Sequence, residues 1–208
     1  VLWLVWAVVV GWAATRSGRG ETAAEIASDL PPDYSCFVCH HKGGELWNEQ
    51  TPIVEDKLLL GDIHWQRGLR CHDCHGGSPQ IDSFKNHRDD PEFRSLVSRA
   101  AVPAFCGRCH SDIQYMRKFN PSTRTDQEAE YWTSGHGRRL KASSEAKEKD
   151  AEPDKGVATC VDCHGHHGML PVNDSASPVF PTHVAETCAR CHSDEKLMAG
   201  RTYNDRPL

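Results

Sequence analysis

The sequence predicts a mostly α-helical protein with much irregular loop and little or no β-sheet. Only 38% of the 208 residues are hydrophobic. The mean hydropathy of -0.60 leaves too few large aliphatic side chains for a conventional core. No run of alternating apolar and polar residues indicates a strand. Ten cysteines and thirteen histidines stand out instead, so we expect something other than aliphatic side chains to organise the chain.

All ten cysteines fall into five copies of one pattern, Cys-x-x-Cys-His, of which chance predicts about 0.03 copies in such a chain. Two thiols three positions apart lie on one helical turn and can add to the two vinyl groups of a protohaem. The next residue, histidine, then lies beneath the ring as the proximal iron ligand. Zinc ribbons or disulfides leave the five histidines in this fixed register unexplained. The sequence therefore predicts five covalently bound haem c groups, with thioether bonds at Cys36, Cys39, Cys71, Cys74, Cys106, Cys109, Cys160, Cys163, Cys188 and Cys191 and proximal ligands His40, His75, His110, His164 and His192.

Five covalent haems change the core that we expect. Each is a large apolar disc, and 208 residues leave only about 42 residues of chain per haem. Short helices and loops should therefore wrap around haems that lie close together and form the centre of the fold. Closely spaced haems pass electrons rapidly, so the small number of residues per haem predicts a protein that conducts electrons.

Eight further histidines can supply the sixth ligand that low-spin iron requires in a multihaem chain. Histidines isolated from the motifs suit this distal role, and His167 has a spacing that suits a neighbouring haem. His41 directly follows His40, so the two imidazoles diverge and can serve two irons. The predicted distal ligands are His41, His64, His87, His136 and His167, with His166 competing with His167 and His183 competing with His41. His72, between the cysteines of its own motif, is expected to point away from that ring.

Methionine is the other possible sixth ligand, and it would raise the potential of its haem. Met116, Met169 and Met198 each have a simpler explanation as packing residues. Histidine on both faces of every haem is the simplest assignment, because enough histidines are present. Such haems have low potentials and do not bind substrates at iron.

Residues 1–14 form an unbroken apolar run. Because a membrane-spanning helix needs about 20 residues, we interpret this run as the C-terminal part of an N-terminal transmembrane anchor, with Trp12 near the interface. The hydrophobic region of a signal peptide is the alternative. Either interpretation places the haem domain on the periplasmic or extracytoplasmic side, where haem attachment to this motif occurs in bacteria.

The motifs divide the rest of the chain into regions. Residues 15–35 form a polar tether. Residues 36–119 carry the first three motifs, which start 35 residues apart, and residues 160–208 carry the last two. Between them, residues 120–159 are a linker with an exposed charged insertion.

Three local patterns predict elements within these regions. Asp90 followed by Pro91 predicts a helix that runs to about Ala100. A capping-box pattern at 125–128 predicts a helix toward Trp132. Residues 141–156 have no apolar periodicity, so we interpret them as the exposed insertion, a solvated loop.

The five motifs together with the extra histidines resemble the multihaem cytochromes c. The segments Ser134-Gly-His-Gly, Thr159-Cys-Val-Asp-Cys-His-Gly-His-His-Gly and Glu186-Thr-Cys-Ala-Arg-Cys-His are similar to those of bacterial respiratory and extracellular electron-transfer cytochromes. This resemblance implies that His136 and His167 are distal ligands. The doubled His40-His41 resembles small tetrahaem cytochromes, in which the second histidine ligates another haem. An amino-terminal anchor before several haems is similar to the NapC/NrfH quinol dehydrogenases, which usually carry four haems, and to the pentahaem subunit of alternative complex III.

These features favour a membrane-anchored electron relay within a larger redox complex. It would pass electrons between a quinol-linked or other redox membrane partner and a soluble carrier, with no catalytic residue beyond the haems. One alternative is an enzyme, either a membrane quinol dehydrogenase or a multihaem reductase with one open-site haem. Another is a subunit of a polymeric extracellular cytochrome filament. The net charge of -5 argues against a nucleic-acid partner.

Overall fold

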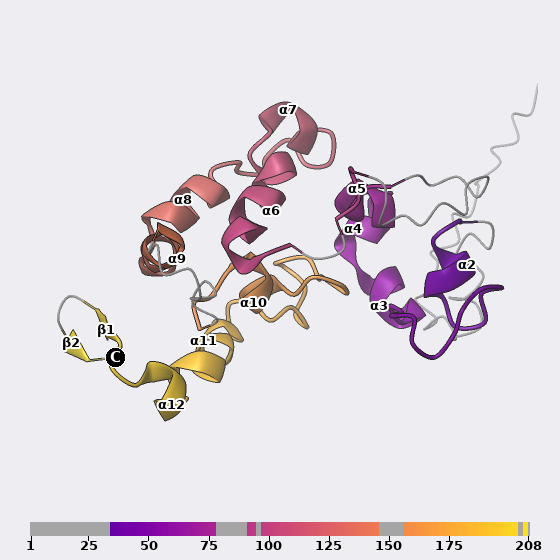
Figure 1. Ribbon diagram of the computed structural model, residues 1–208. Helices are drawn as coiled ribbons and strands as arrows, with labels where there is room; N and C mark the ends of the chain where they lie inside the picture. The colour runs from indigo at the N-terminus through magenta and orange to yellow at the C-terminus, as the bar shows by residue number, and fades with distance from the viewer. Residues whose placement is uncertain (1–33, 78–90, 95–96, 146–155, 204–205, 208) are drawn as a thin grey trace, which may run out of the picture.

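The computed structural model describes residues 34–77, 91–94, 97–145, 156–203 and 206–207 (Figure 1). Its helices are α2 (Phe37–His40), α3 (Asp56–Gly61), α4 (Ile63–Gln66), α5 (Cys71–His75), the 3-10 helix η2 (Arg99–Ala101), α6 (Val102–His110), α7 (Ile113–Met116), α8 (Gln127–Thr133), α9 (Gly135–Glu145), α10 (Cys160–His164), α11 (Val184–His192) and α12 (Glu195–Met198). Strands β1 (Thr202–Tyr203) and β2 (Arg206–Pro207) form an antiparallel pair of two residues each. The prediction of a mostly helical, loop-rich fold with little β-structure is confirmed.

The helices form two groups. Figure 1 shows α2 to α5 gathered at one end of the molecule and α6 to α12 at the other. In the second group α6 packs on α8, α8 packs on α9, and α10 packs on α6. Helix α11 packs against α12, which begins two residues after it.

The apolar core of the polypeptide is small. Phe37, Leu59 and Trp65 form its main cluster, against which Tyr34 packs edge-on. Elsewhere among the described residues, the buried apolar side chains are Val102, Leu140 and Val157. A folded domain of this size ordinarily buries much more apolar surface. The small core is what we expect of a chain that wraps around large apolar cofactors.

The helix predicted from Asp90 to Ala100 is wrong over the residues that the structure describes. Pro91 begins a turn, and only Arg99–Ala101 is helical, as a single turn of 3-10 helix. Both backbone groups of Arg94 are bonded to His75. Its N–H donates to the carbonyl of His75 at 2.6 Å, and its carbonyl lies 2.8 Å from Nδ1 of His75. These bonds replace the ones that a helix would form.

The helix predicted near Trp132 is confirmed as α8, but its cap differs. Asp126 is the N-cap, and no side-chain capping bond forms. Arg124 pairs with Asp126 at 2.7 Å and also with Glu130. The acidic side chains of this turn are therefore held by an arginine outside the helix.

The insertion predicted over 141–156 begins as helix rather than loop, because α9 continues to Glu145. The side chain of Leu140 is fully buried and anchors this helix. The hydroxyls of Ser143 and Ser144 donate to the carbonyls three residues earlier, at 2.9 and 2.8 Å, and so continue the helical pattern. Residues 146–155 lie outside the described part of the chain.

The apolar run of residues 1–14 and the tether as far as residue 33 also lie outside the described residues. Within the described ranges, no helix has both the length and the apolar character needed to cross a membrane.

Candidate haem-binding sites

The second and fourth motifs share one local design. Each is a five-residue helix, α5 or α10, whose third residue is aspartate. The Asp73 carboxylate accepts the N–H of Arg70 at 2.7 Å, and the Asp162 carboxylate accepts the N–H of Thr159 at 2.6 Å. This bond satisfies a free donor at the start of the helix. Each helix ends at a glycine with positive φ, directly after the motif histidine.

The third and fifth motifs share a different design. Each lies at the C-terminal end of a nine-residue helix, α6 or α11. Each is followed by Ser-Asp, and the aspartate caps the next short helix. Asp112 accepts the N–H groups of two residues at 2.8 and 3.0 Å, and Asp194 accepts two at 2.9 and 3.0 Å. The aspartate thus turns the chain directly after the motif histidine.

Two motif histidines are oriented by backbone carbonyls. Nδ1 of His40 lies 2.8 Å from the carbonyl of Pro52, and Nδ1 of His75 lies 2.8 Å from that of Arg94. A carbonyl can only accept, so Nδ1 carries the proton in each ring. Nε2 then carries the lone pair in each ring, the form in which histidine ligates a metal.

Three motif histidines lie opposite a histidine from elsewhere in the chain. The ring centroids of His64 and His110 are 6.0 Å apart. Those of His75 and His167 are 6.1 Å apart, and those of His136 and His192 are 6.1 Å apart. These three pairs contain three of the five predicted proximal residues and three of the five predicted distal ones.

This spacing fits an iron held between two imidazoles. A metal–nitrogen bond of about 2 Å on each side, plus about 1 Å from the nitrogen to the centre of each ring, puts the centroids roughly 6 Å apart. All ten cysteines are free, as thioether formation requires. The residues present therefore fit covalently bound haem with two axial histidines.

Burial keeps several of these histidines in the form that binds metal. It lowers the pKa of His110, His136, His164 and His167. Neighbouring imidazoles lower the pKa of His110, His136 and His167 further. These rings are neutral at neutral pH, and neutral imidazole is the iron ligand.

His64 is oriented by a buried carboxylate. Oδ1 of Asp62 accepts the N–H of His64 at 2.7 Å and lies 3.2 Å from Nδ1 of its ring. Burial raises the pKa of Asp62, but hydrogen bonds from His64 and Met169 outweigh burial and hold that pKa below its usual value. His64 therefore has a charged acceptor where His40 and His75 have carbonyls.

Other predicted histidines have different neighbours. Nε2 of His41 lies 2.9 Å from the Asp56 carboxylate, and its ring packs against Phe37. His72 lies 2.8 Å from the hydroxyl of Tyr34. The ring of His166 lies 5.0 Å from that of His167, centroid to centroid, and is tilted against it. His87 lies outside the described residues.

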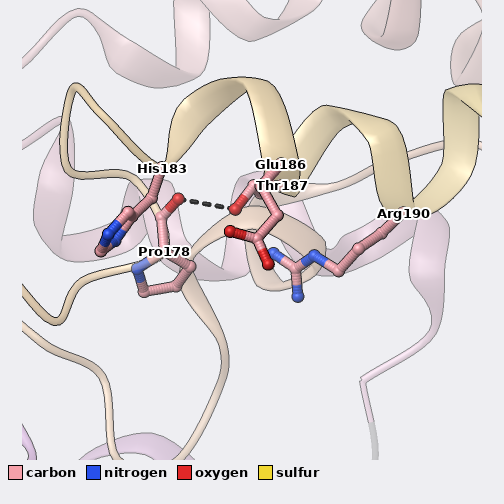
Figure 2. Close-up of a pocket in the computed structure, with 5 residues that line it drawn as sticks. All are labelled: Pro178, His183, Glu186, Thr187 and Arg190. Atoms are coloured by element: carbon pink, nitrogen blue, oxygen red, sulfur yellow. Dashed lines mark hydrogen bonds between the residues drawn. The ribbon is translucent and has the colours of Figure 1, made fainter.

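His183 stands at the start of α11, beside an open pocket of about 260 Å³. Its Nδ1 lies 3.0 Å from the carbonyl of Ser177, which leaves Nε2 available. Figure 2 shows His183 at one end of the pocket, with Glu186 and Arg190 further along the same helix. Thr187 closes the loop by donating to the carbonyl of Pro178 at 2.6 Å. His183 therefore has the same carbonyl support as His40 and His75, whereas Nε2 of His41 is engaged by Asp56.

Two curated relatives match most of the chain. The C-type polyheme cytochrome OmcC of Geobacter sulfurreducens is 23% identical over 205 residues, an alignment that covers 87% of this chain and 24% of that protein. The multiheme cytochrome MtrA of Shewanella baltica is 25% identical over 193 residues, covering 78% of this chain and 53% of that protein. The chain thus spans about a quarter and about half of the lengths of these relatives. No family model and no solved structure matches the chain.

Both relatives are named as cytochromes with several haems. The five attachment motifs here lie on helices, and three of their histidines face a second histidine. This chain is similar to multihaem c-type cytochromes. Its motifs and histidines fit covalently bound c-type haem.

Thiols of successive motifs lie near one another, in the order of the sequence. Hydrogen bonds join Cys36 to Cys71 and Cys106 to Cys160. Cys74 and Cys109, and Cys163 and Cys188, interact electrostatically over a longer range. In the free-thiol form, the hydrogen bond from its partner lowers the pKa of Cys36 to about 6 and that of Cys160 to about 7. As thioethers these sulfurs do not titrate, and only their proximity matters.

The two local designs of the motifs were not predicted from the sequence. The residues that flank the motifs nevertheless indicate them. The second and fourth motifs share Cys-x-Asp-Cys-His-Gly. The third and fifth share Cys-x-Arg-Cys-His-Ser-Asp, with a methionine four residues later. Comparing the motifs by their flanking residues, rather than by their spacing, would have found the repeated pair.

Proposed function

We propose that this cytochrome holds five haem c groups in one row, in the order of their motifs, and passes electrons from one end of the row to the other. The observation that supports this proposal is that thiols of each motif and the next lie near enough to interact, by hydrogen bonds in two cases and electrostatically in the other two. Because both sulfurs of a motif bond to its haem, adjacent sulfurs bring the edges of adjacent haems together. We call this arrangement the haem row.

Each haem in the row is assigned two histidines. The ring pairs support His64 with His110, His167 with His75, and His136 with His192. The carbonyl bond to its Nδ1 favours His183 over His41 as the distal ligand, and we assign it to the haem of His164. His87 is the remaining isolated histidine, and we assign it to the haem of His40.

The roles of the protein groups follow from this assignment. The bound haem supplies an iron that changes between ferric and ferrous states. The cysteines would hold each haem covalently and fix its place relative to the next. Two neutral imidazoles per site keep water and substrates away from the iron, and carbonyl or carboxylate acceptors fix the orientation of the imidazoles. These residues favour electron transfer over substrate chemistry.

We further propose that residues 1–14 anchor the cytochrome to the membrane with its haems on the extracytoplasmic side. Its partners are then other subunits of a redox complex that draws on quinol, and a soluble electron carrier. Mild detergent extraction followed by native mass analysis of the haem-staining species tests this arrangement. A discrete assembly with polytopic subunits is the expected result. Haem found only in soluble or filament fractions would reject the anchor.

Two measurements test the haem row itself. The intact mass of the mature cytochrome should equal that of the chain plus five haems. Low-temperature EPR of the oxidised protein should show only low-spin haem, because every iron has two histidines. A high-spin signal equal to one haem would favour a reductase with one open site instead.

Transport along the row can be measured directly. Lys42 and Lys196 are exposed near the first and fifth motifs, and after maturation a cysteine at each position can attach the protein between two gold contacts. Removing the third haem with C106A/C109A should cut the conductance sharply, because it interrupts the row at its centre. His72→Ala removes a histidine but no haem and should leave conductance unchanged. Equal conductance with and without the third haem would contradict the proposed order.

A further inference from the structure

Asp62 differs from the other groups that orient histidines in this protein. It is a buried carboxylate, 6% exposed, at the junction of α3 and α4. Its Oδ1 faces both the backbone N–H and the ring Nδ1 of His64. Nδ1 of His40, His75 and His183 instead meets a neutral backbone carbonyl.

A charged acceptor changes the electronics of an imidazole ligand. Hydrogen bonds to carboxylate are stronger than those to a carbonyl. They draw the Nδ1 proton away from the ring and make Nε2 a more basic ligand. A more basic axial ligand stabilises ferric over ferrous iron, which lowers the reduction potential. His64 should therefore be a stronger donor than the histidines that rest on carbonyls.

The second oxygen of Asp62 ties this region to a distant loop. Oδ2 accepts the N–H of Met169 at 2.9 Å, and the N–H of Ile63 donates to the Met169 carbonyl at 2.8 Å. Met169 lies two residues after His167. The two bonds form a clamp, defined by Asp62, Ile63 and Met169, that joins the distal histidines assigned to the second and third haems.

A glycine in the loop allows the clamp to close. Gly168 has φ of +72°, a conformation that other residues adopt only at a cost. A Cβ there would lie 2.8 Å from Cδ2 of Leu58, a residue of α3. The loop therefore approaches α3 closely between His167 and Met169. Asp62 is held rigidly enough for its charge to act on one ring.

We propose that Asp62 is a positioning residue that lowers the reduction potential of the haem between His64 and His110 below that of the same haem with a neutral acceptor. The inference rests on the proposed function, because it assumes the assignment of His64 to that haem. The shift acts on the third haem, at the centre of the proposed row.

The test is an EPR-monitored redox titration of the fully haem-loaded protein and its Asp62→Asn variant. Asparagine keeps the size of the side chain and an acceptor oxygen but removes the charge. One low-spin component should shift to higher potential and change its g-values, with the others unmoved. Asp62→Glu, which keeps the charge, should remain closer to the parent. If Asp62→Asn fails to mature, Asp62→Ser replaces it, since a serine hydroxyl also accepts at an N-cap.

Two further variants separate the possible failures. Asp56→Asn removes the carboxylate beside His41, which is not an assigned ligand, and should shift no component. His64→Ala should convert one haem to high spin. An unshifted Asp62→Asn titration together with a high-spin His64→Ala haem would overturn the role of Asp62 and leave the ligand assignment standing. A His64→Ala protein that stays fully low-spin would reject the assignment itself.

Discussion

The pair formed by the second and third motifs and the pair formed by the fourth and fifth are built alike but supported differently. Each pair joins a five-residue helix with an inner aspartate to a nine-residue helix followed by Ser-Asp. Around the first pair, the facing histidines come from α4 and from the loop after α10. Around the second, the ring that faces His192 comes from α9. Attachment is thus encoded locally, whereas the second axial ligand depends on tertiary structure.

Replacing a facing histidine should have the largest effect, because it removes a second axial ligand without affecting haem attachment. His136→Ala should leave haem attachment intact, because both cysteines and His192 remain, but convert one haem from low spin to high spin. The change is all-or-none for that haem and is measured by EPR and by the visible spectrum. His41→Ala is the matched control, since the Nε2 of His41 contacts Asp56. A high-spin haem in the control would restore His41 as a ligand in place of His183.

The two pairs differ in how many partners the aspartate within the five-residue helix has. Asp73 accepts a single backbone N–H at the start of its helix. Asp162 also accepts the hydroxyl of Thr159 at 2.8 Å and pairs with Arg99 at 2.7 Å. Asp162→Asn should therefore lower the free energy of unfolding by about 2 kcal/mol, against about 1 kcal/mol for Asp73→Asn. Thermal unfolding of the holoproteins measures both, and equal losses would show that neither Arg99 nor the Thr159 hydroxyl adds to the stability.

Most of what the sequence predicted correctly is local. The helical class and the place of α8 follow from residues adjacent in the chain, as do the short helices at the motifs. The helix expected at 90–100 failed because Arg94 bonds to His75, a contact that no local pattern reveals. The choice between His41 and His183 depends on which acceptor faces each ring, Asp56 or the Ser177 carbonyl. Both acceptors are brought there by the fold, so the sequence alone left the choice open.

Substitution of two glycines after the fourth motif can distinguish the cost of backbone strain from the cost of a steric clash. Gly165 and Gly168 have φ of +80° and +72°. A Cβ at Gly165 would meet nothing closer than 4.0 Å, whereas one at Gly168 would lie 2.8 Å from Leu58. Gly165→Ala should cost about 1 kcal/mol of unfolding free energy from strain alone, and Gly168→Ala about 2 kcal/mol. Denaturant unfolding distinguishes them, and only Gly168→Ala should also disturb the EPR signal of the haem assigned to His167.

The smallest expected effect concerns the part of the design that the two pairs share. Asp112 and Asp194 each accept two N–H groups at the start of a four-residue helix directly after a motif. Replacing either by alanine should cost about 1 kcal/mol, because each loses the same N-cap. Thermal unfolding of the two single variants should give equal shifts. Unequal shifts would show that the surroundings of α7 and α12, rather than the cap, hold these turns. The third and fifth motifs would then share their flanking sequence but not the interactions that stabilise the turn after each motif.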